Sequence, residues 1–177
     1  MSWAAAALSR PARARLVLFT LLLLGLICRL IRISQPFVDQ WSWREADVAM
    51  IAGNFFRHGF NIFYPQIDWG GPAPGYVGTE FPLVPFLAAL LYRLFGVQAW
   101  IGRGISLAFF ALSLPLFYGL VRRLSNPRSA LAATGVYVLT PLGIFASRSF
   151  MPDMASLSLA IAALALFAAW LEHEPNG

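Results

Sequence analysis

The sequence has no lysine, a single cysteine and few acidic residues: 13 basic residues, all of them arginine, stand against 8 acidic ones. The lone cysteine, Cys28, excludes an internal disulfide framework and a cysteine metal site within this chain. Charged residues make up only 12%, whereas 59% are hydrophobic, and the mean hydropathy is +0.67. These values lie outside the range of ordinary soluble domains, so we predict an integral membrane protein.

The arginines lie at the ends of apolar runs and do not form a basic stripe along one segment. This distribution is typical of membrane topology signals and disfavours binding to nucleic acid. Four apolar runs are long enough to be spans, at about 16–33, 101–121, 130–150 and 153–171. We therefore predict an all-α, multi-pass fold in the cell membrane (the inner or plasma membrane).

The first run, "RPARARLVLFTLLLLGLICRLIRIS", resembles a signal peptide at its basic start. Its apolar stretch, however, continues to Ile33 without a small-x-small cleavage site, which favours an uncleaved first transmembrane helix. Arg10, Arg13 and Arg15 then place the N-terminus in the cytoplasm. With four spans the C-terminus returns to the same side, and residues 34–100 form an external loop.

The external loop is rich in aromatic residues and is predicted to be folded. In "WSWREADVAMIAGNFFRHGF", Ser42 and Glu45 form a possible capping box and Gly59 is a natural stop, so we predict an amphipathic helix over 43–58. A second short helix is predicted over 82–95, too short for a span and therefore juxtamembrane or re-entrant. The aromatic side chains suit an interfacial belt, with sugar stacking as the alternative.

A short second external turn, "RSFMPD", separates the last two predicted spans. Pro152 suits the end of one helix or the beginning of the next, and Asp153 falls in the first turn of the outgoing helix, where a carboxylate favours the helix dipole. Ionisable groups near membrane depth also mark functional sites. Asp153 is therefore either a helix-start residue at the water interface or part of a site.

Four segments together resemble one known family: "WREADVAMIAGNFFRHG", "TEFPLVPFLAALLYRLFG", "GRGISLAFFALSLPLFYGLVRRL" and "SRSFMPDM". In this order and topology they are similar to the N-terminal portion of the GT-C membrane glycosyltransferases of family 39, which include relatives of protein O-mannosyltransferases and of the aminoarabinose transferase that acts on lipid A. The resemblance implies transfer of a sugar, with inversion, from a polyprenyl-phosphate donor to a lipid, glycan or protein acceptor at the outer membrane face. Family members are usually longer, so we expect this chain to be a truncated form that lacks part of the site.

The resemblance also implies that acidic residues of the two external loops meet at the membrane surface and face the donor phosphate. Many relatives have an Asp-Glu pair at the positions of Arg44 and Glu45, with Asp47 following here. Glu45 and Asp47 are about 200° apart on a helix, so one of them must be structural. The candidate catalytic residues are Asp47, Asp153 and Glu45, and the candidate substrate-binding residues are Arg44, Arg103, Arg148 and Glu80.

These residue types suit the chemistry because sugar transfer needs a carboxylate to accept a hydroxyl proton and positive charge on the departing phosphate. Each also has a structural alternative. Glu45 can serve the capping box, Asp47 can pair with Arg44, and Glu80 can begin a helix. The arginines, including Arg29, which is a further candidate for the phosphate, can snorkel to the interface. The cofactor is unknown: a divalent ion at Asp47, Glu80 and Asp153 is conceivable, whereas the predicted topology disfavours a pair of His58 and His173. The alternative function is a non-enzymatic four-helix transport or assembly subunit.

Overall fold

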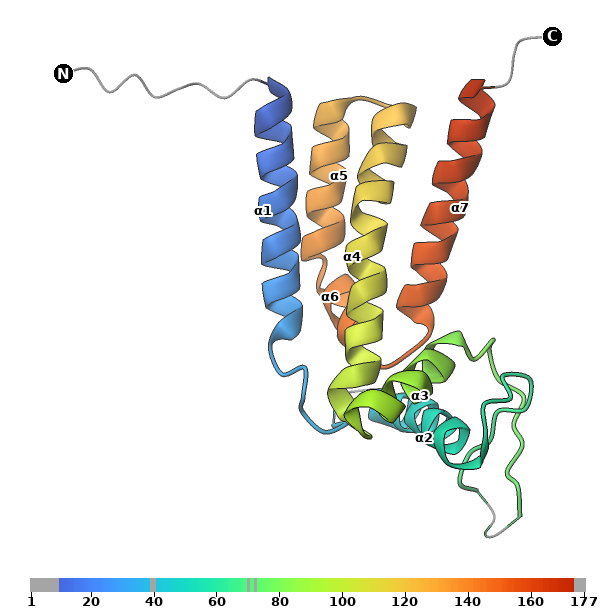
Figure 1. Ribbon diagram of the computed structural model, residues 1–177. Coiled ribbons are helices and arrows are strands. Elements are labelled where there is room, and N and C mark those ends of the chain that lie inside the picture. The colour runs from blue at the N-terminus through green and yellow to red at the C-terminus, as the bar shows by residue number, and fades with distance from the viewer. Residues whose placement is uncertain (1–9, 39–40, 70, 72, 174–177) are drawn as a thin grey trace.

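The computed structural model describes residues 10–38, 41–69, 71 and 73–173, and within them the chain is helical without a strand. Short connections join α3 to α7 in order, whereas longer segments join α1 to α2 and α2 to α3 (Figure 1). Their bounds are α1 Arg10–Leu30, α2 Ser42–His58, α3 Leu83–Phe95, α4 Ala99–Leu124, α5 Pro127–Leu139, α6 Pro141–Arg148 and α7 Asp153–His173.

The helices form two layers. The first is a bundle of α1, α4, α5 and α7 that run alongside one another, with the short α6 at its lower part, and α4 contacts each of the other four. The second layer is the pair of α2 and α3, which lies across one end of the bundle (Figure 1). The turn between α6 and α7 reaches the same end, so both segments predicted to be external are found together.

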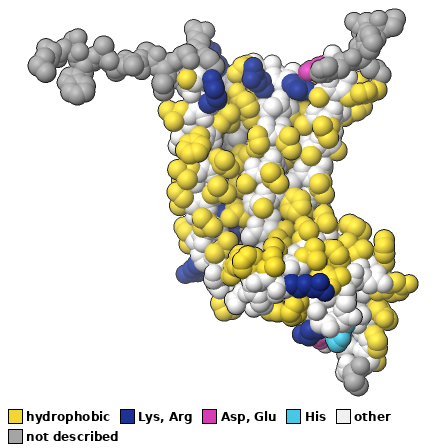
Figure 2. Space-filling view, viewed as in Figure 1, with side chains coloured by type: hydrophobic (Ala, Val, Ile, Leu, Met, Phe, Trp, Pro, Cys, Tyr) yellow, Lys and Arg dark blue, Asp and Glu magenta, His cyan; other side chains and the backbone are white. Residues whose placement is uncertain are grey.

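The bundle has the length and composition of a membrane domain. Within the described residues, α4 and α7 are each long and apolar enough to cross a membrane, and the bent pair α5 and α6 together provides a third candidate span. Hydrophobic side chains cover the outward face of the bundle in Figure 2, as lipid contact requires. The predicted all-α membrane fold is confirmed.

The third predicted span, 130–150, is not one straight helix. It is divided into α5 and α6, whose axes differ by 61°. Thr140 is extended, with φ −60° and ψ 124°, and Pro141 begins α6. Proline has no N–H to continue the helical ladder and disfavours helical geometry in the residue before it, so Pro141 is the physical cause that the prediction of a single helix overlooked.

The break leaves backbone carbonyl groups without helical partners, and Arg29 of α1 satisfies one of them. Its side chain is completely buried and donates to the Val138 carbonyl at 3.1 Å, as well as to Ser147 Oγ on α6. The guanidinium carbon also lies 3.7 Å from the centre of the Phe110 ring on α4. Arg29, which the sequence offered as a snorkelling or phosphate-binding residue, instead joins α1, α4, α5 and α6 inside the bundle.

The second layer rests on a small apolar core. Val48 and Ala52 of α2 pack with Val84 and Ala88 of α3 and with Ile101 of α4. Helix α2 begins at Ser42, one residue before the predicted start, but no side chain caps its N-terminus. The predicted capping box between Ser42 and Glu45 is therefore wrong, and Glu45 is directed elsewhere.

The α6–α7 turn is locked to α4 by an aromatic side chain. Phe150 is fully buried, and its ring lies against Gly102 so closely that a methyl group added at Gly102 would come within 2.1 Å of a ring carbon. Ser106 Oγ also donates to the Ser149 carbonyl at 2.7 Å. The turn is therefore part of the packed core at this end of the bundle.

This contact predicts that Gly102→Ala destabilises the protein, by about 1–3 kcal/mol as for other overpacked cores, because the Phe150 ring has to move. Gly104→Ala is the matched control, since its added methyl group would meet only the Trp100 ring at 3.8 Å. Thermal unfolding of the detergent-purified variants, followed by tryptophan fluorescence, measures the difference. Equal melting temperatures for the two variants would contradict the packing described.

Candidate functional site

Glu45 lies at the junction of the two layers and is completely buried. Its Oε1 accepts a hydrogen bond from the Phe150 backbone N–H at 2.7 Å and another from Arg103 Nε at 3.2 Å. Its Oε2 accepts from Arg103 Nη2 at 3.1 Å. The carboxylate thus connects α2 with α4 and with the α6–α7 turn.

Arg103 has an acceptor for every N–H group of its guanidinium. One bond from Nε and one from Nη2 go to Glu45, two from Nη1 go to the carbonyl groups of Ile33 and Gln35, and the second from Nη2 goes to the Pro36 carbonyl. The side chain is only 2% exposed. Because all five donors are occupied, Arg103 has none left for a substrate phosphate in this arrangement.

Glu45, a candidate catalytic residue, therefore forms an ion pair with Arg103, a candidate phosphate ligand. Their pair fixes the segment after α1, helix α2, helix α4 and the second external turn at one point. A buried ion pair of this kind contributes little net stability compared with apolar packing, but it fixes geometry, and its partners cannot be removed singly without leaving a buried charge.

Asp47 and Asp153 are in a different situation. Asp47 lies on α2 on the side away from Glu45 and is half-buried, and Asp153 is exposed in the first turn of α7. Within the described residues neither carboxylate has a hydrogen bond or an ion pair, including the pair between Asp47 and Arg44 that the sequence suggested. Both carboxylates are at the end of the bundle where α2 lies.

Arg44 is paired with Glu80 across the start of the second layer. Its Nη2 donates to Glu80 Oε1, and both side chains are partly exposed. Thr79 Oγ1 donates to Glu80 Oε2 at 2.7 Å, and this bond, with a backbone hydrogen bond and the nearby Arg44, lowers the pKa of Glu80 below its ordinary value. Glu80 therefore stays ionised at neutral pH, and an exposed pair of this type is weak enough to exchange partners.

Arg148 is the last residue of α6 and is half-buried. Its Nη1 donates to the Ile31 carbonyl just after α1, at 3.2 Å. It therefore lies at the end of the bundle where α2 carries Arg44, although the two residues are far apart in the sequence. The guanidinium of Arg44 thus lies on the second layer, and that of Arg148 lies at the end of the bundle.

The acidic residues that the structure describes do not gather into a metal site. Among the residues that the structure describes, no three side chains of His, Cys, Asp or Glu are grouped closely enough to hold a metal ion. The ion that the sequence made conceivable at Asp47, Glu80 and Asp153 is therefore not supported by this geometry.

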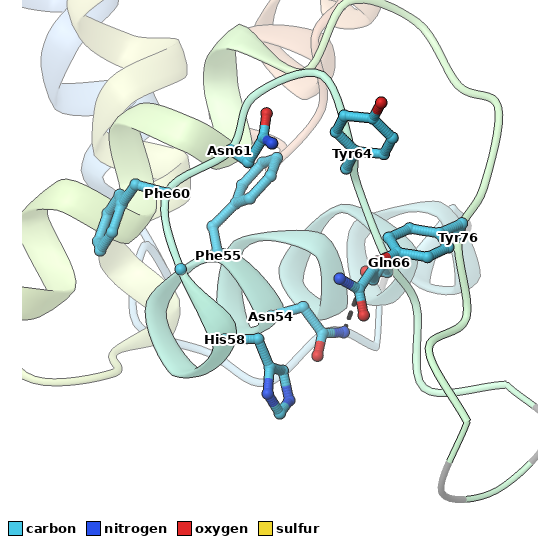
Figure 3. A pocket seen from close by; sticks show the side chains of 9 residues that line it. Asn54, Phe55, His58, Phe60, Asn61, Tyr64, Gln66 and Tyr76 are labelled. Atoms are coloured by element: carbon cyan, nitrogen blue, oxygen red, sulfur yellow. Dashed lines mark hydrogen bonds between the residues drawn. The ribbon is translucent and has the colours of Figure 1, made fainter.

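A pocket of about 440 Å³ lies between the C-terminal part of α2 and the loop that follows it (Figure 3). Its lining includes residues with amide, imidazole and phenol side chains together with two phenylalanines. The lining residues are Asn54, Phe55, His58, Gly59, Phe60, Asn61, Tyr64, Gln66 and Tyr76. Pockets with a few polar groups among aromatic walls are typical small-molecule sites, and this volume is in their usual range.

The loop wall of the pocket is held by Asn54, whose amide donates to the Gln66 carbonyl at 3.0 Å and to Asp68 Oδ1 at 2.9 Å. Arg57 pairs with the same carboxylate at 3.0 Å. The Asn54 hydrogen bond, and then the bond from Arg57, lower the pKa of Asp68 below its ordinary value. Asp68 therefore remains an anion that ties the loop to α2 at any pH above the ordinary carboxyl range.

The sequence did not predict this pocket, although part of it could have been inferred. Asn54 and His58 lie seven and eleven residues after Asp47, so all three share one face of α2. The contributions of Tyr64, Gln66 and Tyr76 could not have been inferred, because the irregular loop has no periodicity that places side chains.

Comparison with known proteins gives a family. A family model described as dolichyl-phosphate-mannose-protein mannosyltransferase matches residues 77–176, more than half of the chain. The matched region includes α3 to α7 and the second external turn. No curated protein and no solved structure matches the chain at a significant level.

The buried pair predicts that Glu45→Gln lowers the free energy of unfolding by roughly 3–5 kcal/mol, because Arg103 then remains charged and buried without a counterion. Asp47→Asn removes the same charge two residues away, where no ion pair exists among the described residues, and should change stability by less than about 0.5 kcal/mol. Denaturation of both variants in the same detergent provides the comparison. A Glu45→Gln protein as stable as Asp47→Asn would show that the pair does not hold the two layers together.

Proposed function

Since the chain belongs to the dolichyl-phosphate-mannose-protein mannosyltransferase family, a family of membrane glycosyltransferases of the GT-C type, we propose that it transfers a sugar from a polyprenyl-phosphate donor. The acceptor is a lipid, a glycan or a protein at the outer face of the cell membrane, and the N-terminus is cytoplasmic. The four apolar segments then cross the membrane as α1, α4, the bent pair α5 and α6, and α7, and α2 and α3 lie on the outer surface.

The observation that carries this proposal is the contrast among the acidic residues. Glu45 is buried and fully bonded, whereas Asp47 and Asp153 have no partners within the described chain and lie in the two segments that the Glu45–Arg103 pair joins. A carboxylate without a structural partner, held in place by a rigid neighbour, is what general base catalysis requires. Asp47 is therefore the catalytic base, Asp153 supports it from the second loop, and Glu45 positions both.

The proposed reaction is a single displacement with inversion. Asp47 accepts the proton of the acceptor hydroxyl as that oxygen forms a bond with the anomeric carbon of the sugar. The bond between this carbon and the phosphate oxygen breaks, and polyprenyl phosphate leaves with the bonding electrons. Because the transition state has oxocarbenium character, the negative charge of Asp153 near the sugar lowers the barrier electrostatically.

The departing phosphate needs positive charge, and Arg44 and Arg148 are better placed to supply it than Arg103. Arg44 is partly exposed, and its ion-pair partner among the described residues, Glu80, is an exposed carboxylate that a phosphate can replace. Arg148 lies at the end of α6, against the segment that follows α1. The tail of the donor lipid approaches along the side of the bundle. Guanidinium groups suit this role because they bind phosphate oxygens in a bidentate manner and stay charged near lipid.

The pocket beside α2 is the proposed binding site for the acceptor. Asn54 and Asp47 lie on one face of α2 about 10 Å apart along its axis, from the rise per residue of a helix. An acceptor seated among the amides and tyrosines of the pocket therefore extends toward Asp47. The family match also favours an enzyme over the alternative of a non-enzymatic transport or assembly subunit.

Asp47→Asn is expected to reduce sugar transfer at least 100-fold, the usual contribution of a general base, and Asp153→Asn is expected to reduce it less. The measurement is incorporation of radiolabelled sugar from a polyprenyl-phosphate donor in membranes that contain the full-length protein. Glu172→Gln is the control, because Glu172 pairs with Arg123 at the opposite end of the bundle. Normal transfer by Asp47→Asn at equal expression would refute its role as base.

Tyr76→Ala is expected to raise the KM for the acceptor about 2- to 10-fold with little change in kcat, because an aromatic contact of this kind contributes about 0.5–1.5 kcal/mol. Trp69→Ala is the matched control, since Trp69 is 79% exposed on the same loop and does not line the pocket. Steady-state kinetics with varied acceptor at saturating donor separate the two constants. The same KM for both variants would place the acceptor elsewhere.

A further inference from the structure

A second pocket, of about 910 Å³, lies at the opposite end of the bundle from α2 and α3, where α1 begins and α4 passes into α5. Three arginines line it: Arg15 from α1, Arg122 from α4 and Arg128 from α5. Basic side chains gather at this end of the molecule in Figure 2. No acidic residue is among the described residues of the lining, so their charge has one sign.

The three guanidinium groups are exposed, and within the described residues none of their side chains has a hydrogen bond or an ion pair. The neighbouring Arg123 is different: it pairs with Glu172 of α7 at 3.4 Å and does not line the pocket. A general preference for arginine at helix ends explains the presence of all four residues. It does not explain why three of them, from three different helices, surround one cavity without counterions.

The wall of the pocket changes from basic to apolar toward the interior of the bundle in the same way on each helix. Leu18 follows Arg15 by three residues, Tyr118 precedes Arg122 by four, and Leu131 follows Arg128 by three. Residues three or four apart lie on one helix face, about one turn from each other. Each helix therefore contributes a guanidinium at the rim and a hydrophobic or aromatic side chain one turn deeper.

We propose that this pocket binds an anionic phospholipid from the leaflet on its own side of the membrane. The phosphate of the headgroup lies among Arg15, Arg122 and Arg128, and the adjoining part of an acyl chain lies along the apolar wall that Leu18, Tyr118 and Leu131 provide. The charge of the rim, the depth of the apolar wall and the position at the end of the spans all match a phosphate attached to a hydrocarbon chain. The proposal does not depend on sugar transfer, because the pocket is at the other end of the bundle from Asp47.

The test is native mass spectrometry of the full-length protein, released from detergent and titrated with phosphatidylglycerol or with phosphatidylcholine of the same acyl chains. The protein is expected to bind phosphatidylglycerol at least tenfold more tightly than phosphatidylcholine. The double variant Arg122→Gln, Arg128→Gln is expected to lose this preference, whereas Arg123→Gln, the matched control, retains it. Unchanged melting temperatures verify that the variants are folded, and Arg15→Gln tests the rim from the third helix.

Three results would overturn the proposal. Equal binding of the two phospholipids would exclude recognition of the anionic headgroup. An equal loss of the preference for phosphatidylglycerol in Arg123→Gln and in the double variant would show that the preference follows net charge and not this pocket. Polyprenyl phosphate is used as a third ligand, because it also carries a phosphate on a hydrocarbon chain. If it binds tenfold more tightly than phosphatidylglycerol and the double variant abolishes that binding, the occupant is a polyprenyl lipid and not a membrane phospholipid.

Discussion

The buried pair between Glu45 and Arg103 is the interaction on which the arrangement of the membrane-surface segments depends. It brings together parts of the chain that are 58 residues apart and adds the Phe150 N–H, 105 residues from Glu45. The pair takes up the inward side of α2, and the opposite side of the same helix carries Asp47 and His58 together with Asn54, which is buried against the loop. One helix therefore has a structural face and a face available for chemistry.

Most of the fold could be predicted from the sequence because lipid imposes strong constraints on composition and length. A helix was expected at 43–58 and is found at Ser42–His58, and a short one was expected at 82–95 and is found at Leu83–Phe95. The break at Pro141 was missed because the apolar composition of residues 130–150 is continuous. Composition measures the preference for lipid, whereas the missing N–H of one proline decides whether the helix continues.

The site was less predictable because the role of a charged residue depends on its partner. Helical spacing correctly separated Glu45 from Asp47, but it could not show that Glu45 would find Arg103 on a distant helix. The same applies to Arg29, whose partners Val138 and Ser147 are made available by the break between α5 and α6. In both cases an arginine that looked suited to phosphate is buried and hydrogen-bonded to groups of the protein itself.

The partners of Arg29 also impose an order on membrane insertion. Val138 and Ser147 follow Arg29 by 109 and 118 residues, so at ribosomal rates they are synthesised roughly 5–25 s after it. During that interval the guanidinium in the last turn of α1 has no acceptor from α5 or α6, and a long basic side chain near the end of a lone helix extends to the polar interface. The guanidinium of Arg29 therefore lies at the headgroup level until the third span arrives, and the bundle closes around it only then.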